Sequence, residues 1–198
     1  MTKYFIKFSV LLGLLVLLPI IFISVVLVYL EDGTPVVFNQ ERLGINKKIF
    51  KIYKIRTMKQ GTPSRGTHEI SKKNYLFIGS ILRKSKIDEL PQLINLLKGD
   101  INLIGPRPGL DSQIELKECR EKLNVFSVKP GITGLAQVLG YDMSNPKKLS
   151  EIDSMYINRK NIKADIYIFI ATFLRPFRQK VLKIYRNEIS EVEKEYGF

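Results

Sequence analysis

The segment RKSKIDELPQ, at residues 83–92, organises the sequence around it. It places two adjacent carboxylates, Asp88 and Glu89, in a strongly basic region, because most charged residues between Arg42 and Lys86 are lysine or arginine. Opposite charges nearby favour the ionised form of a carboxyl group, and an ionised carboxylate in a cationic pocket can attack phosphorus. The pair is therefore the first candidate for a catalytic centre.

An ordinary helix start explains the same pair when it is considered alone. Apolar residues follow at helical spacing, namely Leu90, Leu93, Ile94 and Leu97. Acidic residues favour the first turn of a helix, and proline is tolerated there. A helix of this kind is expected to end at Gly99. The dipeptide by itself favours this structural role, so the surrounding sequence has to decide.

Composition narrows the classes of function. The chain has 198 residues, a size for one domain with a real core. With 32 basic and 19 acidic residues the net charge is +13, which suggests nucleic acid, anionic lipid or phosphorylated substrates as partners. The lone Cys119 excludes an internal disulfide, and with His68 as the single histidine a zinc site is not supported. A hard cation on carboxylate and phosphate oxygens fits better, and Mg²⁺ fits best.

The N-terminal run from Phe8 to Leu30 is uncharged and almost wholly apolar. As a straight helix it would measure ~35 Å at 1.5 Å per residue, enough to cross a hydrocarbon core of ~30 Å. The run is too long for a signal peptide, and no small-residue cleavage site follows it. We expect membrane association.

Two topologies remain open for this run. A spanning helix with Lys3 and Lys7 inside would put the whole basic domain outside the cell. Pro19 lies mid-run and removes a backbone donor, which permits a helix-break-helix that returns to the same face. Non-helical backbone at that depth needs polar partners, and Ser24 is a candidate.

The region before the carboxylate pair is expected to be a strand, a loop and a helix. Residues 49–58 alternate apolar and basic side chains and are expected to form a strand that presents Lys54 and Arg56. Taken alone, this pattern is more often a solvated basic face. Residues 60–73 are polar and rich in turn formers, so we expect a loop, followed by a helix at residues 75–83.

Two loops rich in glycine and proline follow the pair. In GPRPG, residues 105–109, two prolines fix the backbone around Arg107 and reduce the entropy lost when its guanidinium binds an anion. In VKPGITGLAQV, residues 128–138, glycines such as Gly131 let backbone N–H groups approach a phosphate. This loop lacks the order of a Walker or Rossmann loop, so the general phosphate signal is weak.

The remaining segments predict a mostly helical α+β fold. Helices are expected at residues 111–124 and around 152–157. The apolar stretch at 165–174 is too short to span a bilayer. The basic amphipathic stretch that follows it, through Tyr185, suits a membrane surface.

Together these stretches resemble the bacterial sugar transferase family, the monotopic phosphoglycosyl transferases. The resemblance covers most of the chain, from the apolar N-terminus through Leu174, and several ordered motifs make it specific. Asp153, Tyr156 and Asp165 also fall where the family places such residues. The motifs are FKIYKIRTM at 50–58, DELPQ at 88–92, GPRP at 105–108 and KPGITGLAQV at 129–138.

The resemblance implies transfer of a phosphosugar from a UDP-sugar to a polyprenyl phosphate such as undecaprenyl phosphate, initiating a cell-surface glycan or glycoconjugate. Asp88 would be the nucleophile that forms a covalent phosphosugar intermediate and releases UMP, with Glu89 as its acidic partner. Mg²⁺ at Asp88, together with Arg83 and Arg107, would handle the diphosphate. Further contacts are expected from Lys54 and Arg56 to phosphate, and from Pro130, Gly131, Thr133 and Gln137 to the nucleotide or sugar.

The resemblance also implies a monotopic protein on the cytoplasmic face of the bacterial inner membrane. Pro19 matches the proline at which the family's N-terminal segment is broken and re-entrant. The expected organisation is a re-entrant segment at residues 1–32, a cytoplasmic catalytic domain with interfacial helices at 33–185 and a polar tail at 186–198. Bilayer lipids are expected partners, downstream glycosyltransferases are further candidates, and nucleic acid is not expected.

The sequence departs from the family pattern at a few places. Leu139-Gly140-Tyr141 stands where family members commonly have Gly-Arg after the Ala-Gln-Val stretch, which leaves the sugar unidentified. Ile55 replaces a common phenylalanine. Longer relatives carry extra N-terminal membrane helices, so the chain corresponds to the minimal catalytic form.

Two other classes of function stay open. A membrane-anchored basic binding module without catalysis would fit the charge of +13, but it would need no Asp-Glu pair beside rigid loops. A nucleotide-sugar phosphodiesterase could use the same carboxylates, and it would release product without a lipid acceptor.

Overall fold

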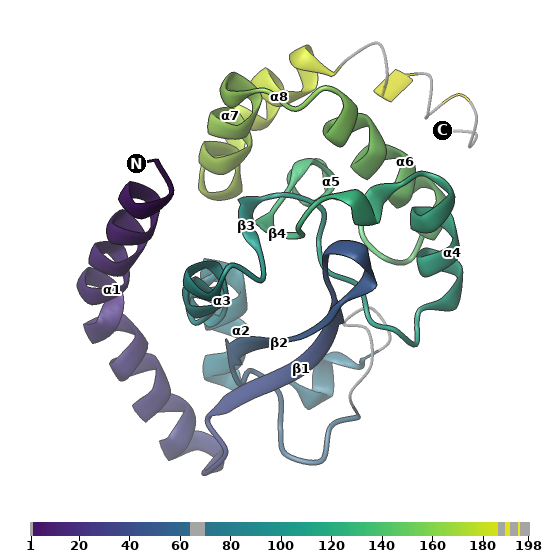
Figure 1. Cartoon of the computed structure of the whole chain (residues 1–198). Coiled ribbons are helices and arrows are strands. Elements are labelled where there is room, and N and C mark those ends of the chain that lie inside the picture. The colour runs from purple at the N-terminus through teal and green to yellow at the C-terminus, as the bar shows by residue number, and fades with distance from the viewer. Residues whose placement is uncertain (1, 64–69, 186–188, 191–193, 195–198) are drawn as a thin grey trace. The chain divides into compact units, whose positions relative to one another are not determined.

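The computed structural model describes residues 2–63, 70–185, 189, 190 and 194 (Figure 1). Contacts divide the chain into two compact units, and each is described by itself. The first comprises Met1–Glu41 and Lys51–Asp100, and the second comprises Arg42–Phe50 and Ile101–Phe198. Most of the expected tail at residues 186–198, and the middle of the expected loop at 60–73, lie outside the described residues.

Helix α1, Thr2–Asp32, carries the apolar run of the N-terminus. Its portion Val10–Asp32 has a mean hydropathy of 3.2, and 6% of its most apolar window is buried inside the protein. Among the described residues it is the one helix long and apolar enough to cross a membrane. Side chains such as Leu15, Phe22 and Leu30 are exposed. Because so large an apolar surface is unstable in water, it suits contact with lipid.

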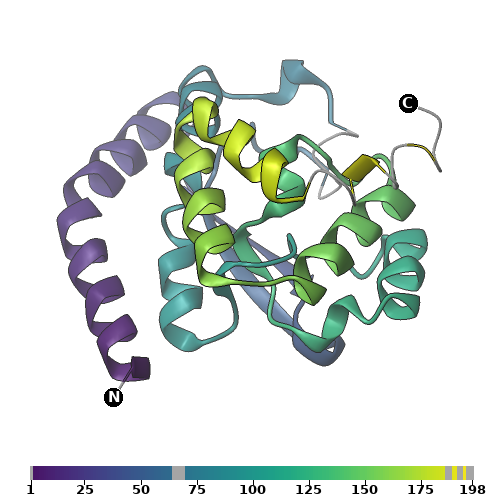
Figure 2. The ribbon, with the colours of Figure 1, turned by 90° about the horizontal axis from the view of Figure 1, so that it is seen from above.

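The expected break at Pro19 is not seen, because α1 continues through this residue as one helix. Long apolar helices tolerate proline when neighbouring groups satisfy the freed backbone. The hydroxyl of Ser24 donates a hydrogen bond of 2.7 Å to the carbonyl of Ile20, a pattern that often bends helices. Figures 1 and 2 show that α1 is curved rather than straight.

A strand pair and several short helical segments complete the first unit. Strand β1, Val37–Leu43, pairs with β2, Ile49–Ile55, and β2 confirms the strand expected at residues 49–58. Both strands continue into the second unit. The helical segments are the 3-10 turn η3 at Lys72–Asn74, α2 at Phe77–Ser85, the 3-10 turn η4 at Ile87–Glu89 and α3 at Gln92–Lys98.

The C-terminal half of α1 packs against these segments. Val28 is fully buried and forms one apolar cluster with Ile55, Leu76 and Leu82. Helix α1 contacts α2, α3 and η4. The apolar helix and the turn that carries the carboxylate pair therefore share one core.

Helix α2 lies very close to the chain that follows β2. A Cβ atom at Gly79 would come within 2.2 Å of the carbonyl oxygen of Thr57, so only glycine permits this approach. The same carbonyl accepts a hydrogen bond of 3.1 Å from the N–H of Leu76. Contact with Thr57 therefore fixes the position of α2.

Helix α3 is joined to β2 through Asn95, which is fully buried. Its Oδ1 accepts a hydrogen bond of 3.2 Å from the N–H of Tyr53, and its Nδ2 donates one of 2.7 Å to the carbonyl of Lys51. Nδ2 also donates to Oδ2 of Asp100 at 3.1 Å. Gly99, with φ 82°, ends α3 as expected.

The second unit is built around a short pair of parallel strands. Strand β3, Asn102–Ile104, pairs with β4, Gly131–Thr133, with Asn102 opposite Gly131 and Ile104 opposite Thr133. The helices are α4 at Ile114–Lys122, α5 at Leu135–Leu139, α6 at Pro146–Asn158, α7 at Ile162–Phe173 and α8 at Arg178–Ile184. The 3-10 turns are η1 at Ile45–Lys47, η5 at Val125–Ser127 and η6 at Arg175–Phe177.

The core of the second unit draws on β3 and on all of its α-helices. Its fully or nearly fully buried members include Leu135, Leu149, Ile152, Tyr156, Ile168, Val181 and Tyr185. The helices expected at residues 111–124 and 152–157 are confirmed as α4 and α6, and the apolar stretch at 165–174 falls mainly in α7. The expected fold class, mostly helical α+β, is confirmed.

Candidate active site

The carboxylate pair lies in a turn that a left-handed residue begins. Lys86, with φ 64° and ψ 12°, ends α2 and starts η4. Non-glycine residues rarely adopt this conformation, and such outliers cluster at functional sites. Asp88 and Glu89 follow in η4 and are 6% and 9% exposed. The pair therefore precedes α3, and both carboxylates are largely removed from water.

Glu89 forms an ion pair with Lys54 of β2. The Lys54 Nζ atom lies 2.6 Å from Oε1 of Glu89, and the two side chains are 15% and 10% exposed. We expected Lys54 to contact substrate phosphate. The structure places its ammonium group on Glu89, where it neutralises a buried carboxylate that would otherwise be costly to keep ionised.

The ionisation of Asp88 differs from the sequence-based expectation. Burial is the largest influence on the pKa of Asp88 and raises it above the ordinary value. Lys54 lowers this pKa, Glu89 raises it, and Arg83 and Lys86 lower it. The sequence-based expectation that nearby cations keep Asp88 ionised was therefore wrong for the protein without bound ligands. The effect of desolvation on this pKa is larger than that of the cations. Asp88 therefore ionises at a higher pH than an ordinary aspartate does, unless an additional cation lies beside it.

Arg83 belongs to the same cluster as the carboxylate pair. Its Nη1 donates a hydrogen bond of 3.4 Å to the hydroxyl of Thr57. Its guanidinium carbon lies 4.9 Å from the centre of the Tyr75 ring, a cation–π arrangement. Because Arg83 also lowers the pKa of Asp88, the structure brings these two predicted site residues together.

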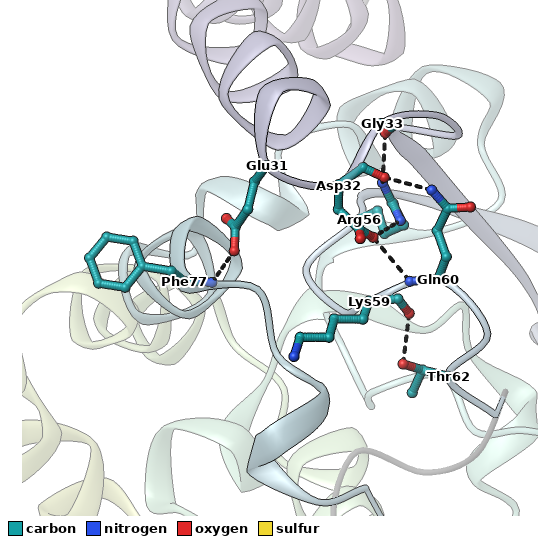
Figure 3. A network of polar contacts seen from close by, with 8 residues as sticks. All are labelled: Glu31, Asp32, Gly33, Arg56, Lys59, Gln60, Thr62 and Phe77. Atoms are coloured by element: carbon teal, nitrogen blue, oxygen red, sulfur yellow. Dashed lines mark hydrogen bonds and ion pairs between the residues drawn. The ribbon is translucent and has the colours of Figure 1, made fainter.

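Arg56 lies elsewhere, at the end of α1 (Figure 3). It is 6% exposed, and its Nη1 lies 2.5 Å from Oδ2 of Asp32. Its Nη2 donates hydrogen bonds to the carbonyls of Asp32 at 3.0 Å and Gly33 at 2.7 Å. We expected Arg56 to contact phosphate, but these bonds commit its guanidinium to the chain that leaves α1.

In the second unit, a buried ion pair supports the backbone of Arg107, whose side chain is half-buried. Arg120 Nη1 donates a hydrogen bond of 2.8 Å to the carbonyl of Arg107, and its Nη2 lies 2.6 Å from Oδ2 of Asp153. Both charged side chains are 3% exposed. Burial raises the pKa of Asp153, and Arg120 opposes that rise. The loop that carries Arg107 is therefore fixed by more than its prolines.

The glycines of the second loop are explained by packing. A Cβ atom at Gly131 would come within 2.2 Å of the backbone nitrogen of Gly105, and one at Gly134 within 2.2 Å of the Gly105 oxygen. The N–H of Gly131 donates to the carbonyl of Pro106 at 2.9 Å. We expected this N–H to face a phosphate, but it is used inside the protein.

The other predicted residues of this loop also make internal contacts. Pro130 is buried, and its carbonyl accepts a hydrogen bond of 2.8 Å from β3. The hydroxyls of Thr133 and Thr172 lie 2.8 Å apart. Gln137 Nε2 lies 3.5 Å from the carbonyl of Ile132, while its Oε1 is buried without a hydrogen-bond partner within the described residues. The expected contacts of this loop to a nucleotide or sugar stay a prediction.

Sequence reasoning missed the acidic pair that ends α1. Glu31 and Asp32 bind residues far along the chain: the Glu31 carboxylate accepts the N–H groups of Phe77 and Ile78, and Asp32 binds Arg56. Two charges directly after an apolar run were the available signal. No local pattern reveals which distant groups they would contact.

The residues around Asp88 fit a hard cation only in part. Within the described residues, no group of three or more His, Cys, Asp or Glu side chains could hold a metal ion. Asp88 and Glu89 supply adjacent carboxylates, and one oxygen of Glu89 already binds Lys54. Mg²⁺ usually takes one or two carboxylates and completes its shell with water and substrate phosphates. The donor set therefore fits Mg²⁺ that arrives with a phosphorylated substrate.

Comparison with known proteins gives one family and several curated relatives. The family model described as bacterial sugar transferase matches residues 1–179. An uncharacterized sugar transferase, EpsL, of Bacillus subtilis is 39% identical over 77% of this chain and 75% of its own. A UDP-glucose:undecaprenyl-phosphate glucose-1-phosphate transferase of Xanthomonas campestris is 35% identical over 88% of this chain and 38% of its own.

A third relative is the UDP-N-acetylgalactosamine-undecaprenyl-phosphate N-acetylgalactosaminephosphotransferase of Aeromonas hydrophila. It is 35% identical over 78% of this chain and 38% of its own. The chain thus spans well under half of the length of each of these last two relatives. Those two names state different sugars, glucose and N-acetylgalactosamine.

Proposed function

The chain belongs to the bacterial sugar transferase family, and on that premise we propose that it transfers a sugar 1-phosphate from a UDP-sugar to undecaprenyl phosphate. The names of two relatives state this type of reaction. The observation that carries the proposal is the buried turn with Asp88 and Glu89, bordered by Lys54 and Arg83. Such a phosphoglycosyl transferase would begin the assembly of a cell-surface glycan.

The first step of the proposed reaction uses Asp88 as the nucleophile. One carboxylate oxygen attacks the phosphorus next to the sugar, and the bond from that phosphorus to the bridging oxygen of the diphosphate breaks. UMP leaves with the bonding electrons, and the sugar phosphate stays on Asp88 as an acyl phosphate. No proton needs to be transferred when Asp88 is ionised.

The second step regenerates Asp88. A phosphate oxygen of undecaprenyl phosphate attacks the same phosphorus, and the bond to the Asp88 carboxylate breaks. The product is an undecaprenyl diphosphosugar. Because the donor and the acceptor react in turn, a soluble nucleotide and a membrane lipid need not be bound together.

The charged neighbours of Asp88 have separate tasks in this scheme. Arg83 would bind donor phosphate oxygens, since a guanidinium offers a fork of donors. Lys54 holds Glu89 and keeps the turn from carrying two uncompensated carboxylates. For Arg107 and Gln137 the contacts implied by the resemblance, to phosphate and to the nucleotide or sugar, stay predictions.

Mg²⁺ is the proposed cofactor, held by Asp88 with support from Glu89. When bound, it would neutralise diphosphate charge and favour departure of UMP. It would also favour the ionised form of Asp88 and so oppose the effect of burial. Chelation with EDTA should abolish turnover and added Mg²⁺ should restore it. Full turnover of a thoroughly chelated sample would exclude this role.

In the membrane, we propose that α1 bends at Pro19 and re-enters the cytoplasmic leaflet. Both ends of the helix would then lie on the side that contains UDP-sugars. The proline, the back-bonded Ser24 and the curvature of α1 support this proposal.

The reaction is tested by UMP release from a panel of UDP-sugars in the presence of undecaprenyl phosphate. Asp88→Asn keeps the size of the side chain but removes the nucleophile, so turnover should fall by roughly 10³-fold or more. A phosphosugar adduct should be detected by mass spectrometry on the unaltered protein and not on this variant. Near-normal turnover of Asp88→Asn would overturn the covalent mechanism.

The same assay separates a transferase from a nucleotide-sugar phosphodiesterase. A transferase should release at most about one UMP per protein without the lipid acceptor, because Asp88 stays modified. Sustained release without acceptor would favour the phosphodiesterase. No release with any donor would leave the basic binding module as the better description.

A further inference from the structure

The last two residues of α1 contact the rest of the first unit through two separate sets of bonds (Figure 3). The carboxylate of Glu31 accepts hydrogen bonds from the N–H groups of Phe77 at 2.6 Å and Ile78 at 2.9 Å. The carboxylate of Asp32 accepts from Arg56 at 2.5 Å and from the N–H of Gln60 at 3.0 Å. We call Glu31 and Asp32 the acidic clamp.

Glu31 acts as the missing cap of α2. The residue before this helix, Leu76, offers no side-chain acceptor to the first N–H groups. A helix leaves these donors unsatisfied, and its positive end favours a carboxylate. Glu31 meets both needs across a sequence separation of 46 and 47 residues. The end of the apolar helix therefore fixes the start of α2.

Helix α2 connects the residues bound by Glu31 to the turn that contains Asp88. Gly79 lies against Thr57, and Leu82 is buried in the cluster that contains Val28 of α1. The far end of α2 bears Arg83 and then Lys86, whose left-handed backbone begins the turn with Asp88. A shift of the start of α2 therefore moves Arg83 and Asp88 with it.

Asp32 holds the other carboxylate of the pair through β2. Arg56, bound by Asp32, follows the last residue of β2, and Lys54 of the same strand holds Glu89. Gln60 adds a second attachment, because its Nε2 donates a hydrogen bond of 2.6 Å to the carbonyl of Asp32. Glu31 is thus connected to Asp88 through α2, and Asp32 is connected to Glu89 through β2.

We infer that Glu31 and Asp32 are positioning residues, which set the geometry of Asp88 and Glu89 from the point where α1 ends. This inference rests on the proposed function, since it assigns a purpose to the carboxylate pair. A transferase with a lipid acceptor needs its nucleophile at a fixed place relative to its membrane helix. Small misplacements of reacting groups are costly, with about 10²-fold in rate for a shift of ~1 Å.

The test compares Glu31→Ala, Glu31→Gln and the control Glu41→Gln, which changes an exposed carboxylate of β1. Glu31→Ala should lower kcat by about 10- to 100-fold and leave the KM for the UDP-sugar within about twofold. Glu31→Gln keeps the length and one acceptor oxygen, so its kcat should lie between those of Glu31→Ala and the unaltered protein. Glu41→Gln should match the unaltered protein.

Formation of the phosphosugar adduct in a single turnover gives the second readout. It should slow in Glu31→Ala in proportion to kcat, at temperatures where thermal unfolding shows every variant to be folded. A kcat for Glu31→Ala within twofold of the unaltered protein would overturn the inference. So would a loss that appears wholly as a higher KM. If the unaltered protein releases no UMP, the proposed function fails first, and the two failures are thereby told apart.

Discussion

At the scale of single residues, the main conflict concerns Asp88. A nucleophile must be ionised, yet burial raises the pKa of this carboxyl group. Raised pKa values of buried acids are common where chemistry is done. The groups that face Asp88 are Lys54, Glu89, Arg83 and Lys86, and together they do not cancel the effect of burial. Ionisation of Asp88 therefore lowers the stability of the folded state.

The first prediction concerns how the stability of the folded state changes with pH as Asp88 ionises. The folded state binds the Asp88 proton more tightly than the unfolded state, so ionisation costs stability as pH rises from about 4 through the raised pKa. Asp88→Asn resembles the protonated acid. In EDTA, its Tm should exceed that of the unaltered protein at pH 7–8, and the difference should vanish below about pH 4.

Glu41→Gln is the matched control for this experiment, because Glu41 is exposed. Its Tm should follow that of the unaltered protein throughout. A lower Tm for Asp88→Asn at neutral pH would contradict the raised pKa. Added Mg²⁺ should reduce the difference, since a cation at Asp88 favours its ionised form.

At the scale of elements, α2 connects the end of α1 to the carboxylate turn. Its close contact with Thr57 exists because residue 79 has no side chain. A second prediction follows: Gly79→Ala should destabilise the protein by about 1–3 kcal/mol, or by several degrees in Tm. Because Arg83 also binds Thr57, the variant should lose turnover even where it is folded.

Gly13→Ala is the control for that substitution, because a Cβ atom there would meet nothing within 4 Å. Gly13→Ala is the same substitution, glycine to alanine, at a position in α1 where the added methyl group causes no clash. Thermal unfolding of both variants in the same detergent gives the comparison. Equal Tm values for Gly79→Ala and the unaltered protein would mean that α2 can move away from Thr57 without cost.

Local patterns in the sequence predicted many of these elements, but not the partners of their side chains. Gly99 as a helix end and residues 49–58 as a strand depend on neighbours in the chain, so they could be predicted. Lys54 and Arg56 are both basic, two residues apart, and look alike in the sequence. Their roles differ because Asp32 and Glu89 meet them from distant segments. Desolvation of Asp88 could not be predicted either, because it too depends on segments that are distant in the sequence.

At the scale of the whole molecule, α1 could take two arrangements in a bilayer, spanning or re-entrant. A spanning α1 with its basic N-terminus inside would carry the acidic clamp, and the carboxylate pair connected to it through α2 and β2, away from cytoplasmic UDP-sugars. A span of the opposite sense would place Lys3 outside, against the preference of basic residues. A bend at Pro19 avoids both outcomes.

The corresponding prediction uses cysteine labelling in a Cys119→Ser background. Thr2→Cys and Pro63→Cys should both react only with a reagent applied from the cytoplasmic side. Pro19→Leu should favour a straight helix, so part of the population should expose residue 2 outside, with activity lost in proportion. Labelling of Thr2→Cys from outside in the presence of Pro19 would overturn the re-entrant arrangement.

The amide of Asn95 has a consequence for solubility. Lys51 and Tyr53 lie two residues apart on β2, so the carbonyl and the N–H that Asn95 binds point to the same side of the strand. Since β2 pairs with β1 alone in its sheet, that side is a sheet edge, and an open edge is a template for intermolecular pairing and aggregation. The Asn95 side chain occupies this template as a peptide group of a neighbouring strand would. This edge of β2 is thereby protected against edge-to-edge association with other copies of the chain.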